Sequence, residues 1–182
     1  MRRVVWSEYI SLDGVVEEPG MWSLSYFSDD LAEYKYDELF ASDALLMGRV
    51  TYEGFAAAWP TMEEIEGDFA VRMNALPKYV ASTTLEKADW NNSTIVRENV
   101  PDEVARLKQQ SGKDLLIAGG GALARTLLDH GLIDEIRMLL HPIAVGVGQR
   151  LFEGANDSTA LTLIDTQRFD SGVVALTYRP DQ

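Results

Sequence analysis

Hydrophobic and polar positions follow two different periods along the first two thirds of the chain. Short apolar runs, typical of buried strands, lie at residues 4–12, 44–47, 79–82, 94–96 and 115–118. Segments with helical spacing lie between them at 29–40, 51–59, 100–111 and 122–130, and an acidic surface helix is expected over 61–76. Strands that alternate with helices predict a mostly parallel sheet with helices on both faces.

The last third of the chain changes to strands alone. Apolar runs at 133–143, 161–169 and 173–178 predict three strands, and Asp170-Ser171-Gly172 between the last two is a hairpin signal. The expected fold is an α/β fold of three layers, αβα, whose mostly parallel central sheet ends in an antiparallel C-terminal hairpin. We find no internal repeat or linker, so residues 1–182 are expected to form one domain.

Two places along the chain combine a strand, glycine and a helix. Gly119, Gly120 and Gly121 follow the strand at 115–118, and Gly48 follows the strand at 44–47. Glycine tolerates positive φ and lets a ligand approach main-chain N–H groups, and a helix N-terminus favours a phosphate. The pair predicts a dinucleotide whose phosphates are held at two points; tight structural turns are the alternative explanation of the same glycines.

Composition narrows the classes of partner. Hydrophobic residues make up 46% of the chain and charged residues 25%, as in many globular proteins, and the formal net charge is −13. That charge argues against nucleic acid, because Lys and Arg supply most of the affinity for phosphates. No apolar run approaches a membrane span, cysteine is absent, and His130 and His141 lack metal-ligand spacing. We therefore expect a cytoplasmic protein that binds a small molecule and no metal.

The motifs at these positions resemble those of a known superfamily. Gly48-Arg49-Val50-Thr51 is similar to the NADPH-binding junction of dihydrofolate reductases, and residues 117–121 are similar to their second glycine motif. A sister group is the reductase domain of the bifunctional riboflavin-biosynthesis deaminase-reductases. This chain resembles that group more closely at Ser11-Leu12-Asp13-Gly14, at residues 132–137, and at Pro142, Gly146, Gly148, Arg150, Leu151 and Phe152. The resemblance implies a stand-alone protein with the dihydrofolate reductase-like fold, which uses NADPH to reduce a small, flat, pyrimidinone-like or pterin-like heterocycle.

Residues that match the cofactor motifs are the candidate cofactor contacts. They are Gly48, Arg49, Thr51, Ser82, Thr83, Gly119, Gly120, Gly121, Ala122 and Leu123. The planar donor fork of Arg49 suits the 2′-phosphate of NADPH. Thr51 is expected to cap the second helix with its hydroxyl free to meet a phosphate oxygen, and Ser82 and Thr83 are expected to form an anion nest at a strand end.

The prediction of the substrate-binding site depends on fewer residues than that of the cofactor site. Asp13 and Asp30 are the candidate catalytic carboxylates, and Trp22 and Tyr26 are the candidate rings that stack on the heterocycle. Structural explanations exist for all four: helix capping for Asp30, a local turn bond for Asp13, and core packing for the rings. A non-catalytic NADP(H)-binding module or sensor is therefore the alternative function.

The apolar stretch at residues 133–147 needs a cover, because an exposed apolar edge is a liability. Either the helix at 122–130 buries it within the chain, or a second copy covers it in a two-fold dimer. Riboflavin-pathway reductase domains pair through this end of the sheet, so the resemblance implies a homodimer.

Overall fold

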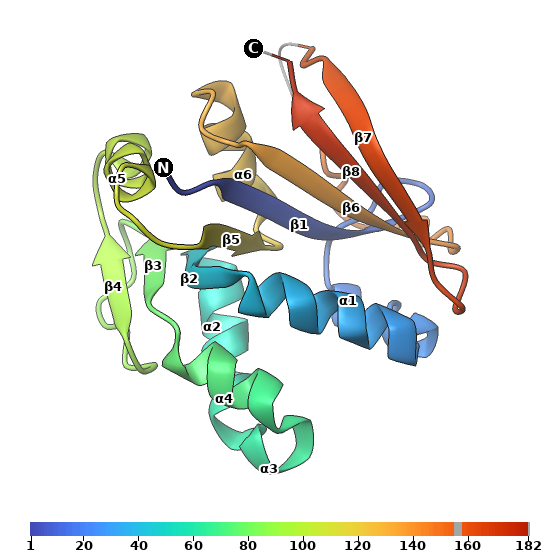
Figure 1. Cartoon of the computed structure of the whole chain (residues 1–182), viewed down its shortest axis with the longest axis horizontal. Coiled ribbons are helices and arrows are strands. Elements are labelled where there is room, and N and C mark those ends of the chain that lie inside the picture. The colour runs from blue at the N-terminus through green and yellow to red at the C-terminus, as the bar shows by residue number, and fades with distance from the viewer. Residues whose placement is uncertain (155–157, 182) are drawn as a thin grey trace.

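In the computed structural model, which describes residues 1–154 and 158–181, eight strands form one sheet in the order β4-β3-β2-β5-β1-β6-β8-β7 (Figure 1). The strands are β1 (Val4–Ser11), β2 (Ser42–Gly48), β3 (Lys78–Ala81), β4 (Ser93–Val96), β5 (Asp114–Ala118), β6 (Glu135–His141), β7 (Leu161–Arg168) and β8 (Val174–Pro180). The first six run parallel, β8 is antiparallel to β6, and β7 is antiparallel to β8. The predicted α/β fold, with its parallel sheet and antiparallel C-terminal hairpin, is confirmed.

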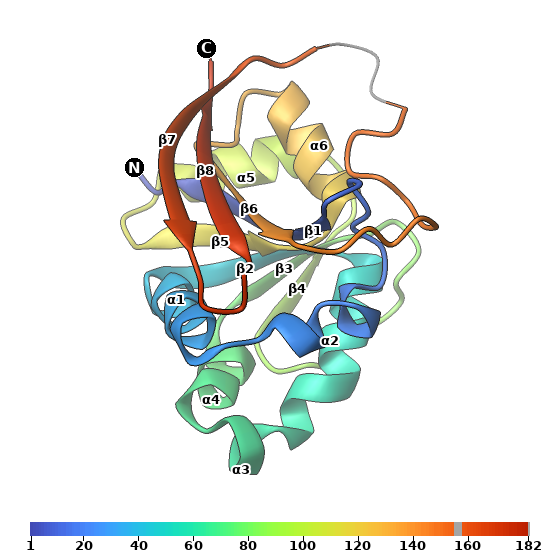
Figure 2. The ribbon, with the colours of Figure 1, turned by 90° about the vertical axis from the view of Figure 1, so that its right-hand side faces the viewer.

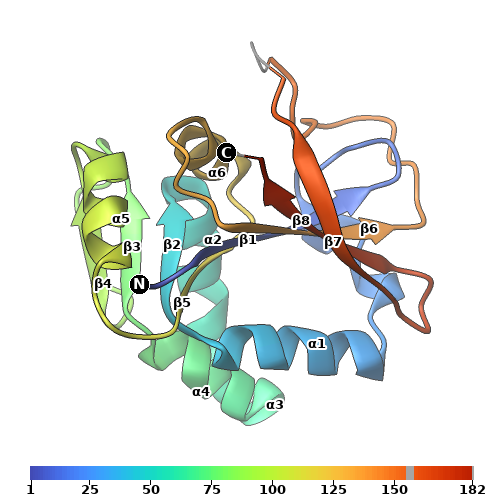
Figure 3. The same ribbon diagram turned by 45° about the horizontal axis from the view of Figure 1, so that its top comes forward.

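Helices cover both faces of this sheet. They are α1 (Asp29–Phe40), α2 (Arg49–Ala58), α3 (Glu63–Glu66), α4 (Asp68–Ala75), α5 (Val100–Lys108) and α6 (Gly121–Asp129). α5 and α6 lie on one face and α1 to α4 on the other (Figure 2). α5 lies over the β3–β4 end of the sheet, while the β7–β8 hairpin forms the opposite end (Figure 3). The central strands are buried on both faces, which explains why residues 44–47 and 115–118 read as continuous apolar runs.

Three apolar clusters hold these layers together. One joins β1, β2, β5 and β6 to α5 and α6, and a second joins the opposite face of the sheet to α1, α2 and α4. The third lies under α1 at the hairpin end and contains Leu31, Leu139, Phe169, Val173 and Ala175. The hairpin is therefore anchored to the sheet by its turn and inner strand, while β7 itself is largely exposed.

The structure corrects three details of the sequence prediction. α2 begins at Arg49 with Gly48 in the N-cap position, so Thr51 lies inside the first turn and is not the cap. The acidic segment forms two helices, α3 and α4, separated by Gly67 at φ 55°, and α4 buries Ala70 and Met73 instead of lying wholly on the surface.

None of the helices within residues 1–154 and 158–181 is long and apolar enough to cross a membrane.

The third correction concerns the apolar stretch at 133–147. β6 is an internal strand, paired with β1 on one side and β8 on the other, so it presents no free edge. Ile136 and Met138 pack in the cluster that contains α6. Burial within the chain therefore covers this strand, and the free edge of the sheet at this end is β7. The homodimer stays a prediction, and β6 offers it no free strand edge.

Candidate functional site

The two strand–glycine–helix junctions lie side by side in the fold. β2 and β5 are neighbours in the sheet, and the chain leaves β2 through α2 toward β3 on one face. It leaves β5 through α6 on the other face and returns in β6, beyond β1 (Figure 1). The crossovers thus diverge between β2 and β5. In open α/β sheets this divergence creates the crevice in which ligands bind, outside the carboxyl ends of the strands.

Distances at the glycines show how closely the two strand–glycine–helix junctions approach each other. Gly119 and Gly120 have φ of 70° and 75°, and a Cβ on Gly120 would lie 3.6 Å from Thr51 Oγ1 and 4.0 Å from the backbone nitrogen of Gly48. A Cβ on Gly48 would meet nothing within 4 Å. The crevice therefore has glycine on both sides and open space above Gly48. With two helix N-termini beside it, this arrangement fits phosphate groups.

Arg125 adds a basic side chain that the sequence analysis missed. A Cβ on Gly121 would lie 3.3 Å from Arg125 Nη1, so the guanidinium lies over the first turn of α6. Nη1 donates a hydrogen bond to the carbonyl oxygen of Leu151 at 2.5 Å. The spacing of four residues from Gly121, which is one helical turn, was the signal available in the sequence.

The remaining candidate cofactor residues take different positions around this crevice. Arg49 is the first residue of α2, is about half exposed, and pairs with Glu53 at 2.9 Å. Ser82 follows β3, and its hydroxyl oxygen accepts hydrogen bonds from the N–H groups of Thr84 and Leu85 at 3.2 and 2.9 Å. Thr83 and Ala122 are exposed, whereas Leu123 packs in the core and offers only its backbone. Arg49 and the α6 turn are thus available to a ligand, while the Ser82 hydroxyl is engaged in its own turn.

Asp13 fixes two loops to each other. Its carboxylate accepts hydrogen bonds from the Ser11 hydroxyl at 2.7 Å and from the N–H groups of Val145 and Gly146 at 2.9 and 2.8 Å. These bonds, that of Ser11 first, lower the pKa of Asp13 to about 2. The carboxylate is therefore ionised at neutral pH, and the geometry favours a positioning role over proton donation.

Asp30 is engaged in a similar way at the start of α1. Its carboxylate accepts bonds from the Ser28 hydroxyl, from the N–H of Leu31 and, across the fold, from the N–H of Asp170. The bond from Ser28 contributes most to a lowered pKa of Asp30. Asp30 ties α1 to the hairpin turn, and nothing in this geometry favours proton donation.

Trp22 and Tyr26 come together around His141, which the sequence analysis considered only as a metal ligand. The ring centroids of Trp22 and Tyr26 lie 5.3 and 6.0 Å from that of His141, both edge-on, and the ring of Tyr9 lies at 5.1 Å. His141 ends β6 and pairs with Ser11 at the end of β1, on the face that carries α1. The two predicted substrate residues therefore belong to one aromatic cluster at the carboxyl edge of the sheet.

Glu8 is a buried acid in the crevice that the sequence analysis overlooked. It is 3% exposed, its Oε2 accepts a hydrogen bond from Trp6 Nε1 at 3.2 Å, and a Cβ on Gly119 would lie 3.6 Å from Oε1. Burial raises its pKa to about 7, although the Trp6 bond and the charges of Lys35 and Arg125 act in the opposite direction. Glu8 is thus an acid that exchanges its proton near neutral pH beside the glycine turn. Its place within an otherwise apolar strand was the available signal.

An open hollow extends the crevice along β1. It is lined by Ile10, Gly14, Arg150, Leu151, Phe152 and Glu153. A Cβ on Gly121 would lie 3.4 Å from Leu151, so the hollow begins where the α6 turn ends. The carboxyl half of β1 therefore lies between this hollow on one face and the aromatic cluster on the other.

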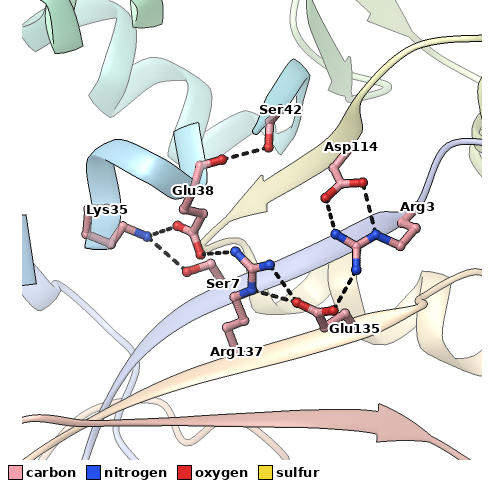
Figure 4. Close-up of polar contacts among 8 residues, drawn as sticks. All are labelled: Arg3, Ser7, Lys35, Glu38, Ser42, Asp114, Glu135 and Arg137. Atoms are coloured by element: carbon pink, nitrogen blue, oxygen red, sulfur yellow. Dashed lines mark hydrogen bonds and ion pairs between the residues drawn. The ribbon is translucent and has the colours of Figure 1, made fainter. Parts of the chain in front are cut away.

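A chain of alternating charges fixes α1 to the sheet beneath the site (Figure 4). Lys35 donates to Ser7 Oγ at 2.9 Å and pairs with the buried Glu38, which also pairs with Arg137 at 3.3 Å. The chain continues through Glu135 and Arg3 to Asp114. Burial is the largest single influence and acts to lower the pKa of Lys35, but the charge and hydrogen bond of Glu38, together with Tyr9 and Tyr34, outweigh it, so the pKa is raised. This network joins α1 to β1, β5 and β6 and keeps Lys35 charged.

Comparison with known proteins identifies the family. The family model described as the RibD C-terminal domain matches residues 2–175. The chain belongs to the RibD C-terminal domain family. Two Bacillus subtilis (strain 168) proteins of this kind are similar over most of their length. YyaP is 31% identical over 97% of this chain and 94% of its own, and YwjB is 26% identical over 94% and 95%.

Solved structures show the same fold. A Shewanella sp. PV-4 protein, whose name assigns it provisionally to riboflavin biosynthesis, superposes with a TM-score of 0.78 and 22% identity over 99% of both chains. A pyrimidine reductase-like protein from Corynebacterium diphtheriae has a TM-score of 0.67 and 15% identity over 100% of this chain and 92% of its own. A Thermotoga maritima diaminohydroxyphosphoribosylaminopyrimidine deaminase/5-amino-6-(5-phosphoribosylamino)uracil reductase has a TM-score of 0.69 and 16% identity, over 99% of this chain and 57% of that one. These likenesses confirm the predicted dihydrofolate reductase-like fold of the RibD type.

Proposed function

We propose that this RibD C-terminal domain protein is an NADPH-dependent reductase of a small, flat heterocycle, pyrimidinone-like or pterin-like. The observation that carries the proposal is the convergence of Gly48, Thr51 and Gly120 at the divergence of the β2 and β5 crossovers. Family membership supports it, as do the names of two similar structures, a pyrimidine reductase-like protein and a deaminase/uracil reductase.

Each part of the crevice has a distinct binding task. The N–H groups at the starts of α2 and α6 bind the pyrophosphate, and Arg125 adds a positive charge beside α6. Arg49 binds the 2′-phosphate with its guanidinium fork. When bound, NADPH supplies the hydride that reduces the heterocycle. The aromatic cluster of Tyr9, Trp22 and Tyr26 supplies flat surfaces for the heterocycle.

A non-catalytic NADP(H)-binding module is the second candidate. The observation that favours it is that both predicted catalytic carboxylates, Asp13 and Asp30, are ionised and occupied by loop contacts. Glu8 favours the enzyme, since it is an acid whose pKa suits proton exchange at neutral pH.

The test follows NADPH absorbance with a panel of pterins, pyrimidinones and flavins. The enzyme proposal expects NADPH consumption with at least one compound, and loss of that activity in Gly120→Val. Gly54→Ala is the matched control, because a Cβ there meets nothing within 4 Å. Binding of NADPH with no consumption would support the module, and absence of NADPH binding would contradict both functions.

A further inference from the structure

His141 holds a buried hydrogen-bond acceptor that has no partner. The residue is 1% exposed, and its Nδ1 lies 2.8 Å from the carbonyl oxygen of Leu139. Because a carbonyl oxygen only accepts, Nδ1 carries the proton and Nε2 presents a lone pair. Nε2 is buried, and no hydrogen-bond partner for it lies within residues 1–154 and 158–181. Burial lowers the pKa of His141, which keeps the ring neutral.

Three aromatic rings surround the imidazole of His141. Tyr9, Trp22 and Tyr26 stand around the imidazole, with Trp22 and Tyr26 at interplanar angles of 85° and 82° to it. An acceptor left unpaired among rings costs folding free energy, so its retention calls for a donor that arrives from outside the chain.

The segment that covers this cluster makes no main-chain hydrogen bond to the sheet within the described part of the chain. Residues 18–27 carry Trp22 and Tyr26 in two 3₁₀ turns, and every main-chain hydrogen bond of this segment is made within it. The Trp22 Nε1–H donates to the carbonyl of Glu17, directly before the segment. Its outer side exposes Met21, Leu24 and Phe27 at 83%, 71% and 51%. Side-chain packing, chiefly that of Trp22 at 9% exposed, therefore holds the segment over His141, and the segment can open locally without breaking a main-chain bond to the sheet.

The cluster also lies within reach of the cofactor crevice. Gly119 donates its N–H to Ser7 on β1, and His141 is opposite Ser11 on the same strand. Four strand residues separate the two points, or about 13 Å at ~3.3 Å per residue.

We propose that Nε2 of His141 accepts a hydrogen bond from an N–H group of the heterocyclic substrate, which enters between His141 and the rings of Trp22 and Tyr26 when residues 18–27 shift outward together with these rings. This rests on the proposed function and narrows its substrate class. The substrate carries a ring N–H or an exocyclic amino group on the edge that enters the cluster. A heterocycle whose nitrogens are all alkylated leaves Nε2 unpaired and is rejected.

Two probes of similar shape distinguish heterocycles that carry an N–H donor from heterocycles that carry none. 6-Aminouracil has N–H donors and 1,3-dimethyluracil has none, and binding of each is followed by tryptophan fluorescence in the presence of NADP⁺. We expect the wild-type protein to bind 6-aminouracil at least about tenfold more tightly. His141→Phe keeps a planar ring but removes the acceptor, and should reduce the preference to less than about threefold with NADPH affinity unchanged. Equal binding by the wild type, or a preference that survives in His141→Phe, would overturn the assignment.

A second measurement needs no variant. The chain has two histidines, and His130 is exposed, so its ring serves as an internal reference for nitrogen NMR. 6-Aminouracil should shift the Nε2 resonance of His141 while the ring of His130 stays unchanged. An unchanged His141 resonance at saturating 6-aminouracil contradicts the proposal. Failure of the protein to bind NADPH would contradict the proposed function separately, because both heterocycle measurements can still be made.

Discussion

Glu8 is a residue whose acidity is strongly changed by its surroundings. The folded state raises its pKa from 4.5 to about 7, so between these values the native protein holds a proton that the unfolded chain has lost. The free energy of unfolding must therefore fall as the pH rises through this range. One pKa unit corresponds to about 1.4 kcal/mol, so the loss approaches about 3 kcal/mol.

Glu8→Gln should remove this pH dependence, because the amide has no proton to lose. Urea unfolding at about pH 5 and about pH 8 measures it: the wild type should lose up to about 3 kcal/mol more than the variant. Glu66→Gln, on the exposed side of α3, should behave like the wild type. Parallel pH profiles for the wild type and Glu8→Gln would show that the carboxyl is not buried as described.

Arg49→Ala should weaken NADPH binding far more than NADH binding. A lost charge-assisted contact to the 2′-phosphate corresponds to about 1.5–3 kcal/mol, and NADH lacks that group. Titration calorimetry gives both affinities. Glu53→Gln releases Arg49 from its 2.9 Å ion pair and should leave NADPH binding unchanged or stronger. An equal loss for both nucleotides in Arg49→Ala would exclude the assignment.

At this scale the sequence predicts motif residues better than buried ones. Gly48, Gly120 and Arg49 could be proposed as cofactor contacts because glycine and arginine beside a helix start form a local sequence motif. Glu8, Arg125 and His141 were missed in these roles because their neighbours come from distant parts of the chain: Gly119 for Glu8, Leu151 for Arg125, and Trp22 for His141.

At the scale of elements, α1 depends on a buried anion. Glu38 is 3% exposed and faces both Lys35 and Arg137. Glu38→Gln would leave Lys35 without its counter-ion and Arg137 with Glu135 alone, which should lower the free energy of unfolding by about 3–5 kcal/mol. Glu103→Gln, which breaks the surface pair with Arg106 on α5, should cost no more than about 1 kcal/mol. Similar urea midpoints for the two variants would contradict a structural role for the network.

The turn before α6 gives the second prediction for an element. Gly120→Val should abolish NADPH binding, because φ of 75° opposes a β-branched residue and its side chain would enter the space beside Thr51. Circular dichroism should show a retained fold, and calorimetry should detect no binding. Normal affinity in this variant would mean that the turn is purely structural.

Elements were predictable from the sequence where periodicity was strong and less so where polar residues dominated. The bounds of α1 agree with its predicted range, since Leu31 and Leu39 repeat at helical spacing. The acidic segment was misjudged because Ala70 and Met73, its buried residues, are too few to reveal a periodic face.

At the scale of the whole molecule, the order of the strands in the sheet could not be predicted from the sequence. Alternation of strands and helices predicts parallel pairing, but it does not say which strand lies at the edge. The apolar composition of residues 133–147 indicated a strand that needs a cover but left open whether the chain or a second copy supplies it, and the structure shows β8 and β7 extending the sheet beyond β6.

We propose that the homodimer forms through β7, the free edge at this end of the sheet. Leu163 and Ile164 on this strand are 49% and 41% exposed, and apolar edge strands are commonly covered. Light scattering at micromolar concentration should give about twice the 20.3 kDa of one chain. Leu163→Lys should give the mass of one chain. Leu140→Lys, in the internal strand β6, should lower stability without concentration dependence. A mass near one chain for the wild type refutes the dimer.

The central position of β1 in the sheet also determines when the protein can fold during its synthesis. Val4 pairs with Leu115 and Val5 with Glu135, so β1 waits at the ribosome for partners that are made more than a hundred residues later. Such distant pairings delay folding and leave an apolar strand exposed in the nascent chain. Gly119 and His141 are both set in place against β1. The proposed crevice is therefore complete only after β6 has been made, when the centre of the sheet closes.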